Sequence, residues 1–114
     1  MTITMPRGDI RQVNFTISTN DGSDLGINFS EIYFTVKPAF NKTEFVFQKR
    51  LSTGEIELMD NGSYQFTIES YDTDGLKIGR YVFDIEVVAG QQVKQTFVGD
   101  LVLTNEVTFV ENEA

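Results

Sequence analysis

Apolar residues alternate with polar residues along most of this chain, and this period of two constrains the fold more than any other feature. The alternation runs unbroken through residues 64–69 and 80–88. Successive side chains of a strand point to opposite faces, so this period is typical of strands that have one face on a core. The sequence therefore predicts an all-β protein.

Further segments show the same pattern. Residues 31–37 place Ile32, Phe34 and Val36 on one face, and Pro38 then ends the predicted strand. Shorter inward rows are expected at Val13, Phe15 and Ile17, at Phe45 and Phe47, and at Leu101 and Leu103. The alternation is weaker in residues 55–59, 92–98 and 107–110.

Turn residues separate these segments at short intervals. Asp60-Asn61-Gly62 predicts a type I′ hairpin, because Asn and Gly tolerate positive φ angles. Other turns are expected at residues 20–22, 52–54 and 89–90. Residues 71–76 break the alternation, and either Asp72 or Thr73 is expected to cap a single helical turn that packs Leu76 against the core.

Short strands with frequent turns indicate the architecture. Within 114 residues, of which 40% are hydrophobic, one core and one domain (residues 1–114) are expected. Seven to nine short strands predict an antiparallel immunoglobulin-like β-sandwich, and a partly closed β-barrel remains the alternative. Tyr81 begins a late strand, so it is either a tyrosine corner, bonded to upstream backbone, or a plain core aromatic.

Composition excludes several classes of function. The chain has no Cys and no His, which rules out disulfides, thiol nucleophiles, imidazole catalysis and the common zinc sites. Its net charge of -8 disfavours nucleic-acid binding, which depends on clustered Lys and Arg. Neither a signal peptide nor a membrane-spanning stretch is recognisable. We expect a non-enzymatic protein without a cofactor, made in the cytoplasm and not inserted into a membrane.

Two short motifs have simpler interpretations than the functions they suggest. Arg7-Gly8-Asp9 matches an integrin-recognition tripeptide, but its place before a strand favours a turn. Asp72-Thr73-Asp74-Gly75 matches part of a calcium loop, yet no third ligand precedes the glycine, and Phe83 stands where the bidentate Glu belongs.

The order of these segments resembles the small immunoglobulin-like structural domains of tailed bacteriophages and of prophages in Gram-positive bacteria. The likeness is greatest to the amino-terminal domain of baseplate upper proteins and covers about residues 7–109. It is carried by Val13-x-Phe15-x-Ile17, by Gly62-x-Tyr64-x-Phe66-x-Ile68, and most distinctively by Asp72-Thr73-x-x-Leu76-x-x-Gly79-x-Tyr81-x-Phe83-Asp84-Ile85-Glu86. Baseplate upper proteins continue into further domains, which favours a separate virion component here.

The resemblance implies a virion structural protein of the tail, baseplate, neck or head surface. Such a protein would be made in the bacterial cytoplasm, assemble with other phage subunits or with itself, and carry no catalytic residues. Two β-prone segments without Lys, residues 2–5 and 107–110, are expected to pair with a neighbouring subunit. Their apolar residues give the first candidate interface positions: Ile3, Met5, Val107 and Phe109.

Aromatic residues outside the predicted core form a second candidate set: Phe29, Tyr33, Phe40 and Tyr71. They are expected to cover secondary hydrophobic clusters or a subunit interface. The alternative is a binding module of immunoglobulin-like fold, in which exposed rings stack on a carbohydrate or another cell-surface ligand.

Overall fold

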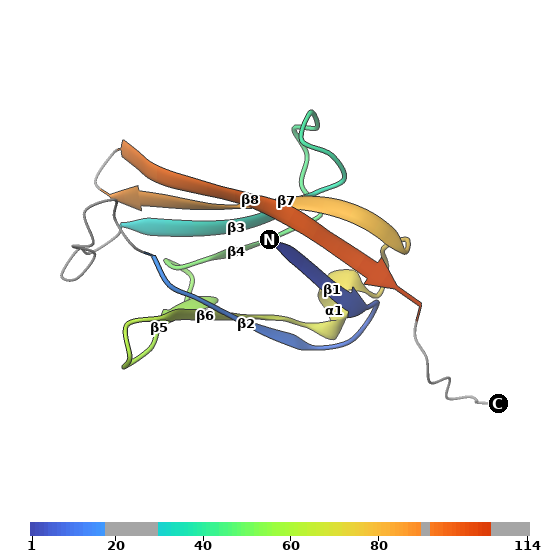
Figure 1. The fold of residues 1–114 in the computed structure, drawn as a ribbon, viewed down its shortest axis with the longest axis horizontal. Helices are drawn as coiled ribbons and strands as arrows, with labels where there is room; N and C mark the ends of the chain where they lie inside the picture. The colour runs from blue at the N-terminus through green and yellow to red at the C-terminus, as the bar shows by residue number, and fades with distance from the viewer. Residues whose placement is uncertain (18–29, 90–91, 106–114) are drawn as a thin grey trace.

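The computed structural model describes residues 1–17, 30–89 and 92–105 (Figure 1). Its elements in chain order are β1 (Thr2–Pro6), β2 (Arg11–Phe15), β3 (Glu31–Lys37), β4 (Phe47–Arg50), β5 (Ile56–Leu58), β6 (Tyr64–Ile68), α1 (Ser70–Thr73), β7 (Gly79–Ala89) and β8 (Gln92–Thr104). The turn predicted at residues 20–22 and the strand predicted at 107–110 lie outside the described residues.

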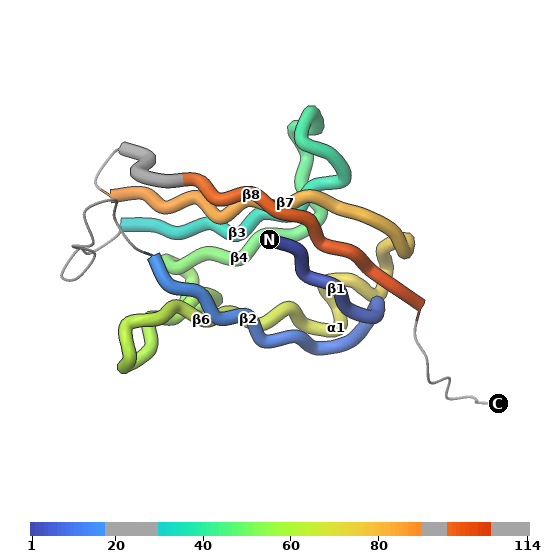
Figure 2. Tube along the Cα trace, in the orientation of Figure 1, coloured from blue at the N-terminus to red at the C-terminus, as the bar shows by residue number. Residues whose placement is uncertain are grey.

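The strands form two stacked sheets. One has the order β1-β8-β7-β3-β4 and the other the order β2-β6-β5. Neighbouring strands are antiparallel except β1 and β8, which are parallel. Figure 2 traces the chain from β1, beside β8, round a turn into β2 of the other layer.

This arrangement confirms the predicted all-β sandwich. The described strands remain in two separate sheets, so the barrel alternative is wrong. The positions of β2, β5 and β6 match strands B, D and E of an immunoglobulin domain, and those of β3, β7 and β8 match strands C, F and G.

Inward-facing rings join the two layers. Phe34 of β3 lies at their centre, with its ring centroid 4.3 Å from that of Phe66 in β6 and 5.2 Å from that of Phe83 in β7. The predicted inward rows of β3, β6 and β7 are buried, apart from the half-buried Tyr81, so the strand registers are confirmed. Phe45 is an exception: it precedes β4 and is exposed, so its predicted inward position was wrong.

The β5–β6 hairpin is confirmed, but its predicted turn type is wrong. Gly62 has φ +88°, whereas Asn61 is not among the residues with positive φ, so the type I′ conformation is excluded. Hydrogen bonds from Gly62 N–H to Met59 C=O and from Met59 N–H to Ser63 C=O close a three-residue loop. This is a type I turn followed by a left-handed glycine, which forms a G1 bulge.

A helical turn connects β6 to β7, as the sequence predicted, but with a different cap. Glu69 is the N-cap of α1, and its N–H donates to the Asp72 carboxylate at 2.7 Å. Leu76 packs against the core as expected. The Tyr81 hydroxyl donates to the Lys77 carbonyl at 2.7 Å, which makes the tyrosine-corner interpretation the correct one.

Candidate interaction surfaces

The first predicted contact segment, β1, is an edge strand whose apolar side chains point inward. Ile3 and Met5 are buried in the core between the sheets, so they hold β1 in place and are not exposed to a partner. The outer side of β1 is also partly protected. Arg11 Nη1 donates to the Thr4 carbonyl at 3.1 Å, and Pro6 has no N–H to offer.

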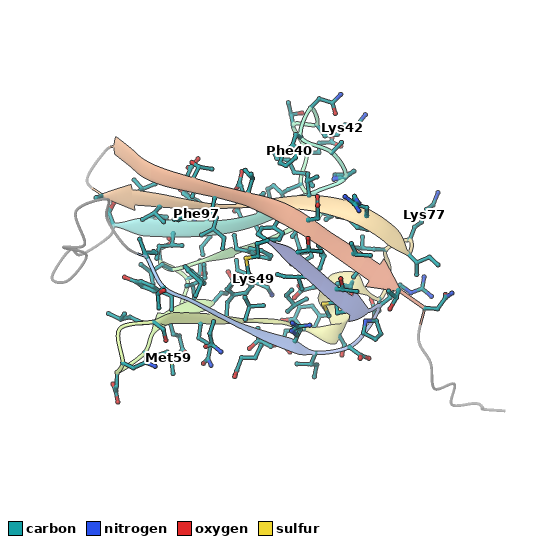
Figure 3. All side chains as sticks on the ribbon, in the orientation of Figure 1. Phe40, Lys42, Lys49, Met59, Lys77 and Phe97 are labelled. Carbon is teal, nitrogen blue, oxygen red and sulfur yellow. The ribbon has the colours of Figure 1, made fainter. Side chains whose placement is uncertain are left out.

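The three described members of the predicted aromatic set lie on different elements. Tyr33 lies on the outer face of β3 beneath Arg50, whose guanidinium carbon is 5.1 Å from the ring centroid. Phe40 is exposed in the β3–β4 loop, far from α1 (Figure 3), and Tyr71 is exposed on α1. Phe29, Val107 and Phe109 lie outside the described residues.

The Arg7-Gly8-Asp9 tripeptide forms the turn between β1 and β2. Gly8 has φ +85°, and its N–H donates to the Thr73 hydroxyl at 2.8 Å. Arg7 Nη1 donates to the Leu76 carbonyl at 3.1 Å. These bonds fix the turn against α1, as expected of a structural segment.

Two partly or fully buried carboxylates are paired with cations. Asp72 lies 2.6 Å from Lys49 Nζ, and both side chains are almost inaccessible. Glu31 accepts hydrogen bonds from Ser52 N–H at 2.9 Å and from Arg50 Nη2 at 2.8 Å. Burial alone would raise the pKa of Glu31, but the bonds from Ser52, Arg50 and Ile32 outweigh it and lower that pKa to about 2. These carboxylates stabilise the fold.

Asp72 of the partial calcium motif is therefore used by Lys49 and by the helix cap. Among the described residues, no three Asp or Glu side chains are grouped so that they could hold a metal ion. No helix in the described part of the chain is long and apolar enough to span a membrane.

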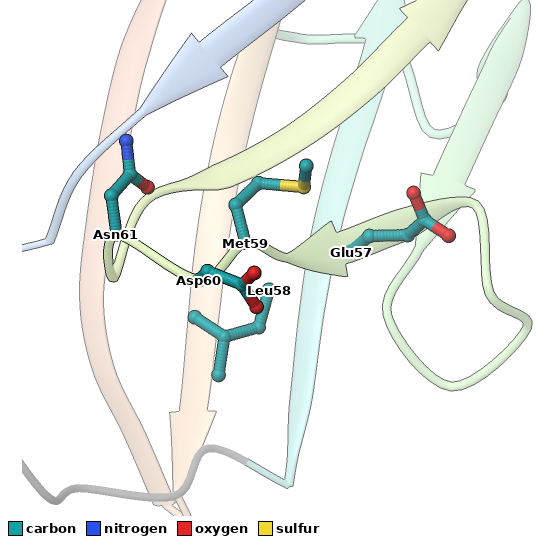
Figure 4. Close-up of a pocket in the computed structure, with 5 residues that line it drawn as sticks. All are labelled: Glu57, Leu58, Met59, Asp60 and Asn61. Atoms are coloured by element: carbon teal, nitrogen blue, oxygen red, sulfur yellow. The ribbon is translucent and has the colours of Figure 1, made fainter.

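One cavity lies at the β5–β6 hairpin (Figure 4). It is lined by five consecutive residues, from Glu57 to Asn61. Figure 4 shows the Glu57 carboxylate well away from Asp60 and Asn61, so these polar groups do not converge on a common point. The cavity is a notch formed by the turn itself and offers no set of ligand contacts.

A polar groove of about 320 Å³ crosses the outer face of the larger sheet. Carboxylates line it on β7, Tyr33 lies on β3, and the exposed Phe45 ring lies beside β4. Its lining is Tyr33, Thr35, Lys37, Thr43, Phe45, Gln48, Asp84 and Glu86. Burial raises the pKa of Asp84, and the nearby Lys37 partly opposes this shift.

An apolar groove of about 310 Å³ opens at the side of the sandwich, between β8 of one sheet and β2 of the other. We call it the lateral groove. Phe97 and Val98 of β8 line it and are 40% and 58% exposed. The remaining lining is Met1, Phe15, Thr16, Phe83 and Ile85.

Within the described residues, the backbone of β8 is unpaired on one side beside this groove. Asp100 N–H donates to the Met1 carbonyl at 3.0 Å, away from β7. Residues two apart in a strand direct their N–H and C=O groups to the same side, so Val98 and Thr96 also direct theirs away from β7. No described strand pairs with this side of β8 before Asp100.

Sequence reasoning did not identify the lateral groove. Its residues come from β2, β7 and β8, from Met1 just before β1 and from Thr16 just after β2, and the fold alone brings them together. One signal was present: Phe97 and Val98 are adjacent apolar residues, and in a strand two neighbours cannot both face the core.

No protein-family model matches this chain, and no curated protein matches it.

Proposed function

We propose that this protein is a non-enzymatic structural subunit that assembles with other subunits by strand addition at β8. The observation that carries the proposal is the edge at Thr96 and Val98, which no described strand pairs with and which lies directly beside the apolar lateral groove. Unpaired backbone groups supply hydrogen bonds to an added strand, and an adjacent apolar pocket selects its side chains.

The sequence resemblance to immunoglobulin-like domains of tailed phages supports a place in a virion, in the tail, baseplate, neck or head surface. The genes beside the one that encodes this chain test that placement. Tail or head genes on both sides are expected. A metabolic operon on both sides would contradict the virion role.

The Val98→Pro variant tests the open edge. Proline removes an N–H that no neighbouring strand within the described chain uses, and edge positions of this kind tolerate it. We expect the variant to fold and to be incorporated at least tenfold less into particles produced with its neighbouring structural proteins. Val98→Ala, which keeps the N–H, is the matched control. Normal incorporation of Val98→Pro would show that assembly does not use this edge.

Carbohydrate binding is the second candidate, and the polar groove favours it. Exposed Phe45 offers a ring for stacking, while Asp84, Glu86 and Gln48 offer hydrogen-bonding groups to sugar hydroxyls. One face of Tyr33 is already occupied by Arg50.

A glycan array separates this candidate from assembly. We expect any specific binding to be lost in Phe45→Ala and retained in Tyr71→Ala, because Tyr71 lies on α1 and does not line the groove. Silence on every glycan would eliminate the second candidate.

A further inference from the structure

β1 shows what kind of segment the lateral groove accepts. It lies along the edge of β8 over residues 100–104, and Ile3 and Met5, two residues apart, fill the space between the sheets. The groove begins where β1 begins, at Met1, and continues along the same edge. An occupant that continues this arrangement is an extended segment with apolar residues at every second position.

The size of the groove agrees with such a segment. A cavity of roughly 150 Å³ is sufficient to hold benzene. The lateral groove, at about 310 Å³, therefore has room for an aromatic side chain of an added strand. Phe97 and Phe15 would contact it from the two sheets.

The carboxyl-terminal sequence contains a segment of this kind. Val107-Thr108-Phe109-Val110 has no charge, is β-prone, and places Val107 and Phe109 two residues apart. The other β-prone terminal segment, residues 2–5, already forms β1 within its own chain.

The same chain cannot supply this segment to its own groove. Val98 lies six residues before the end of β8 at Thr104, a distance of about 20 Å along a strand. Val107 follows Thr104 by three residues, which span at most about 11 Å. β1 also occupies the edge between these points. Residues 107–110 can therefore pair beside Val98 only when another copy supplies them.

We infer that the lateral groove binds residues 107–110 of a second copy of this chain, in a head-to-tail contact. This inference rests on the proposed assembly through β8 and names the partner. Residues 107–110 and the lateral groove are different parts of the chain, so each copy has one segment to insert and one groove to receive a segment. Contacts of this type close into rings or extend into filaments.

A labelled peptide of residues 105–114 tests the contact directly. The receptor is the full-length double variant Val107→Asp, Phe109→Asp, whose own segment cannot compete. We expect saturable binding by fluorescence anisotropy, weakened at least tenfold when the receptor also carries Val98→Pro. A peptide with Phe109→Asp is expected to lose binding, and the peptide with Thr108→Asp, which adds the same charge, is the matched control and retains binding, because residue 108 faces away from 107 and 109 in a strand.

Mixing two full-length variants tests the head-to-tail geometry. The variant Val107→Asp, Phe109→Asp keeps the groove, and Val98→Pro keeps the terminal segment. Each alone is expected to sediment as a monomer, and the mixture is expected to form a one-to-one heterodimer.

The outcomes separate the two proposals. Failure of the peptide to bind the folded receptor, or absence of the heterodimer, overturns the inference about the partner. If particle incorporation still depends on Val98 N–H, assembly at β8 stands with a different occupant. If incorporation is indifferent to Val98→Pro, the proposed function itself fails.

Discussion

Glu31 shows how a single carboxylate fixes the start of β3. Its side chain is buried on the outer side of the sheet and receives hydrogen bonds from Arg50 in β4 and from Ser52 in the following turn. Charge-assisted bonds of this kind are stronger than neutral ones. Glu31 therefore links three consecutive parts of the chain through one charged group.

Replacing Glu31 with Gln is expected to destabilise the fold by about 1 to 3 kcal/mol at neutral pH, because the charge-assisted bonds are lost. The pKa of Glu31 is lowered from 4.5 to about 2 in the folded chain. Its contribution is thus complete above pH 4.5 and is lost as the pH falls toward 2. Denaturant melts from pH 7 to pH 2 should show that the difference in unfolding free energy between the unsubstituted protein and Glu31→Gln becomes smaller. A difference in unfolding free energy that does not change with pH would contradict the role of the Glu31 charge.

Gly99 permits the close approach of three elements. A Cβ atom at this position would lie 2.6 Å from Cζ of Phe83 and would also collide with the Met1 carbonyl oxygen. Gly99→Ala is expected to cost about 1 to 3 kcal/mol, since the ring and the start of β1 must both move. Gly75→Ala is the control, because nothing lies within 4 Å of its Cβ position. Equal stability of the two variants in denaturant melts would disprove this packing.

At the scale of the elements, the inward rows carry most of the stability. Phe66→Ala is expected to cost about 3 to 5 kcal/mol, because Phe66 is buried in the middle strand of the smaller sheet. Gln65→Ala, on the opposite face of β6, should cost under about 1 kcal/mol. Urea melts of the two variants test the register. Similar losses would mean that the faces of β6 are exchanged.

Alternation predicted the strands well where one face meets the core. The bounds of β3, residues 31–37, follow from the pattern and from Pro38. Residues 92–98 and the row at Leu101 and Leu103 were read separately, but they form one long strand. The interruption at Gly99 reflects the Phe83 ring that lies against it, a tertiary cause that the local sequence does not contain.

The turn type and the helix cap were harder to predict than the strands. Asn-Gly is compatible with a type I′ turn, but here Gly62 takes the left-handed position of a three-residue loop. Either Asp72 or Thr73 was expected to cap α1, yet Glu69 is the N-cap, and Asp72 lies inside α1 and pairs with Lys49 of β4. The position of Asp72 depends on Lys49, which is distant in the sequence, so local sequence patterns do not predict it.

The candidate site was predicted least well. The sequence singled out leftover aromatics, and the fold places Tyr33 and Tyr71 on different elements. Ile3 and Met5 were expected at an interface, and the structure uses them in the core. The sequence did not point to β8, where no described strand pairs with the edge next to the lateral groove.

The net charge of the whole molecule opposes the proposed assembly at the edge of β8. Each copy carries a net charge of -8, and residues 107–110 are flanked by Glu106, Glu111 and Glu113. The proposed contact itself is apolar and backbone-mediated, because the groove is lined mainly by Met, Phe, Ile and Val side chains. Repulsion between copies is therefore long-ranged, whereas the attraction is local.

Because the repulsion acts over a longer distance than the apolar contact, salt should affect the two differently in the full-length protein. The screening length falls from about 10 Å at 0.1 M salt to about 3 Å at 1 M, so added salt weakens the repulsion and leaves an apolar, hydrogen-bonded contact largely intact. Sedimentation velocity in increasing sodium chloride should show self-association strengthening severalfold. The Val98→Pro variant carries the same charge and should stay monomeric throughout, which separates contact at β8 from general salting-out. Association that weakens with salt would mean that the copies meet through ion pairs, and the apolar lateral groove would then not be their contact.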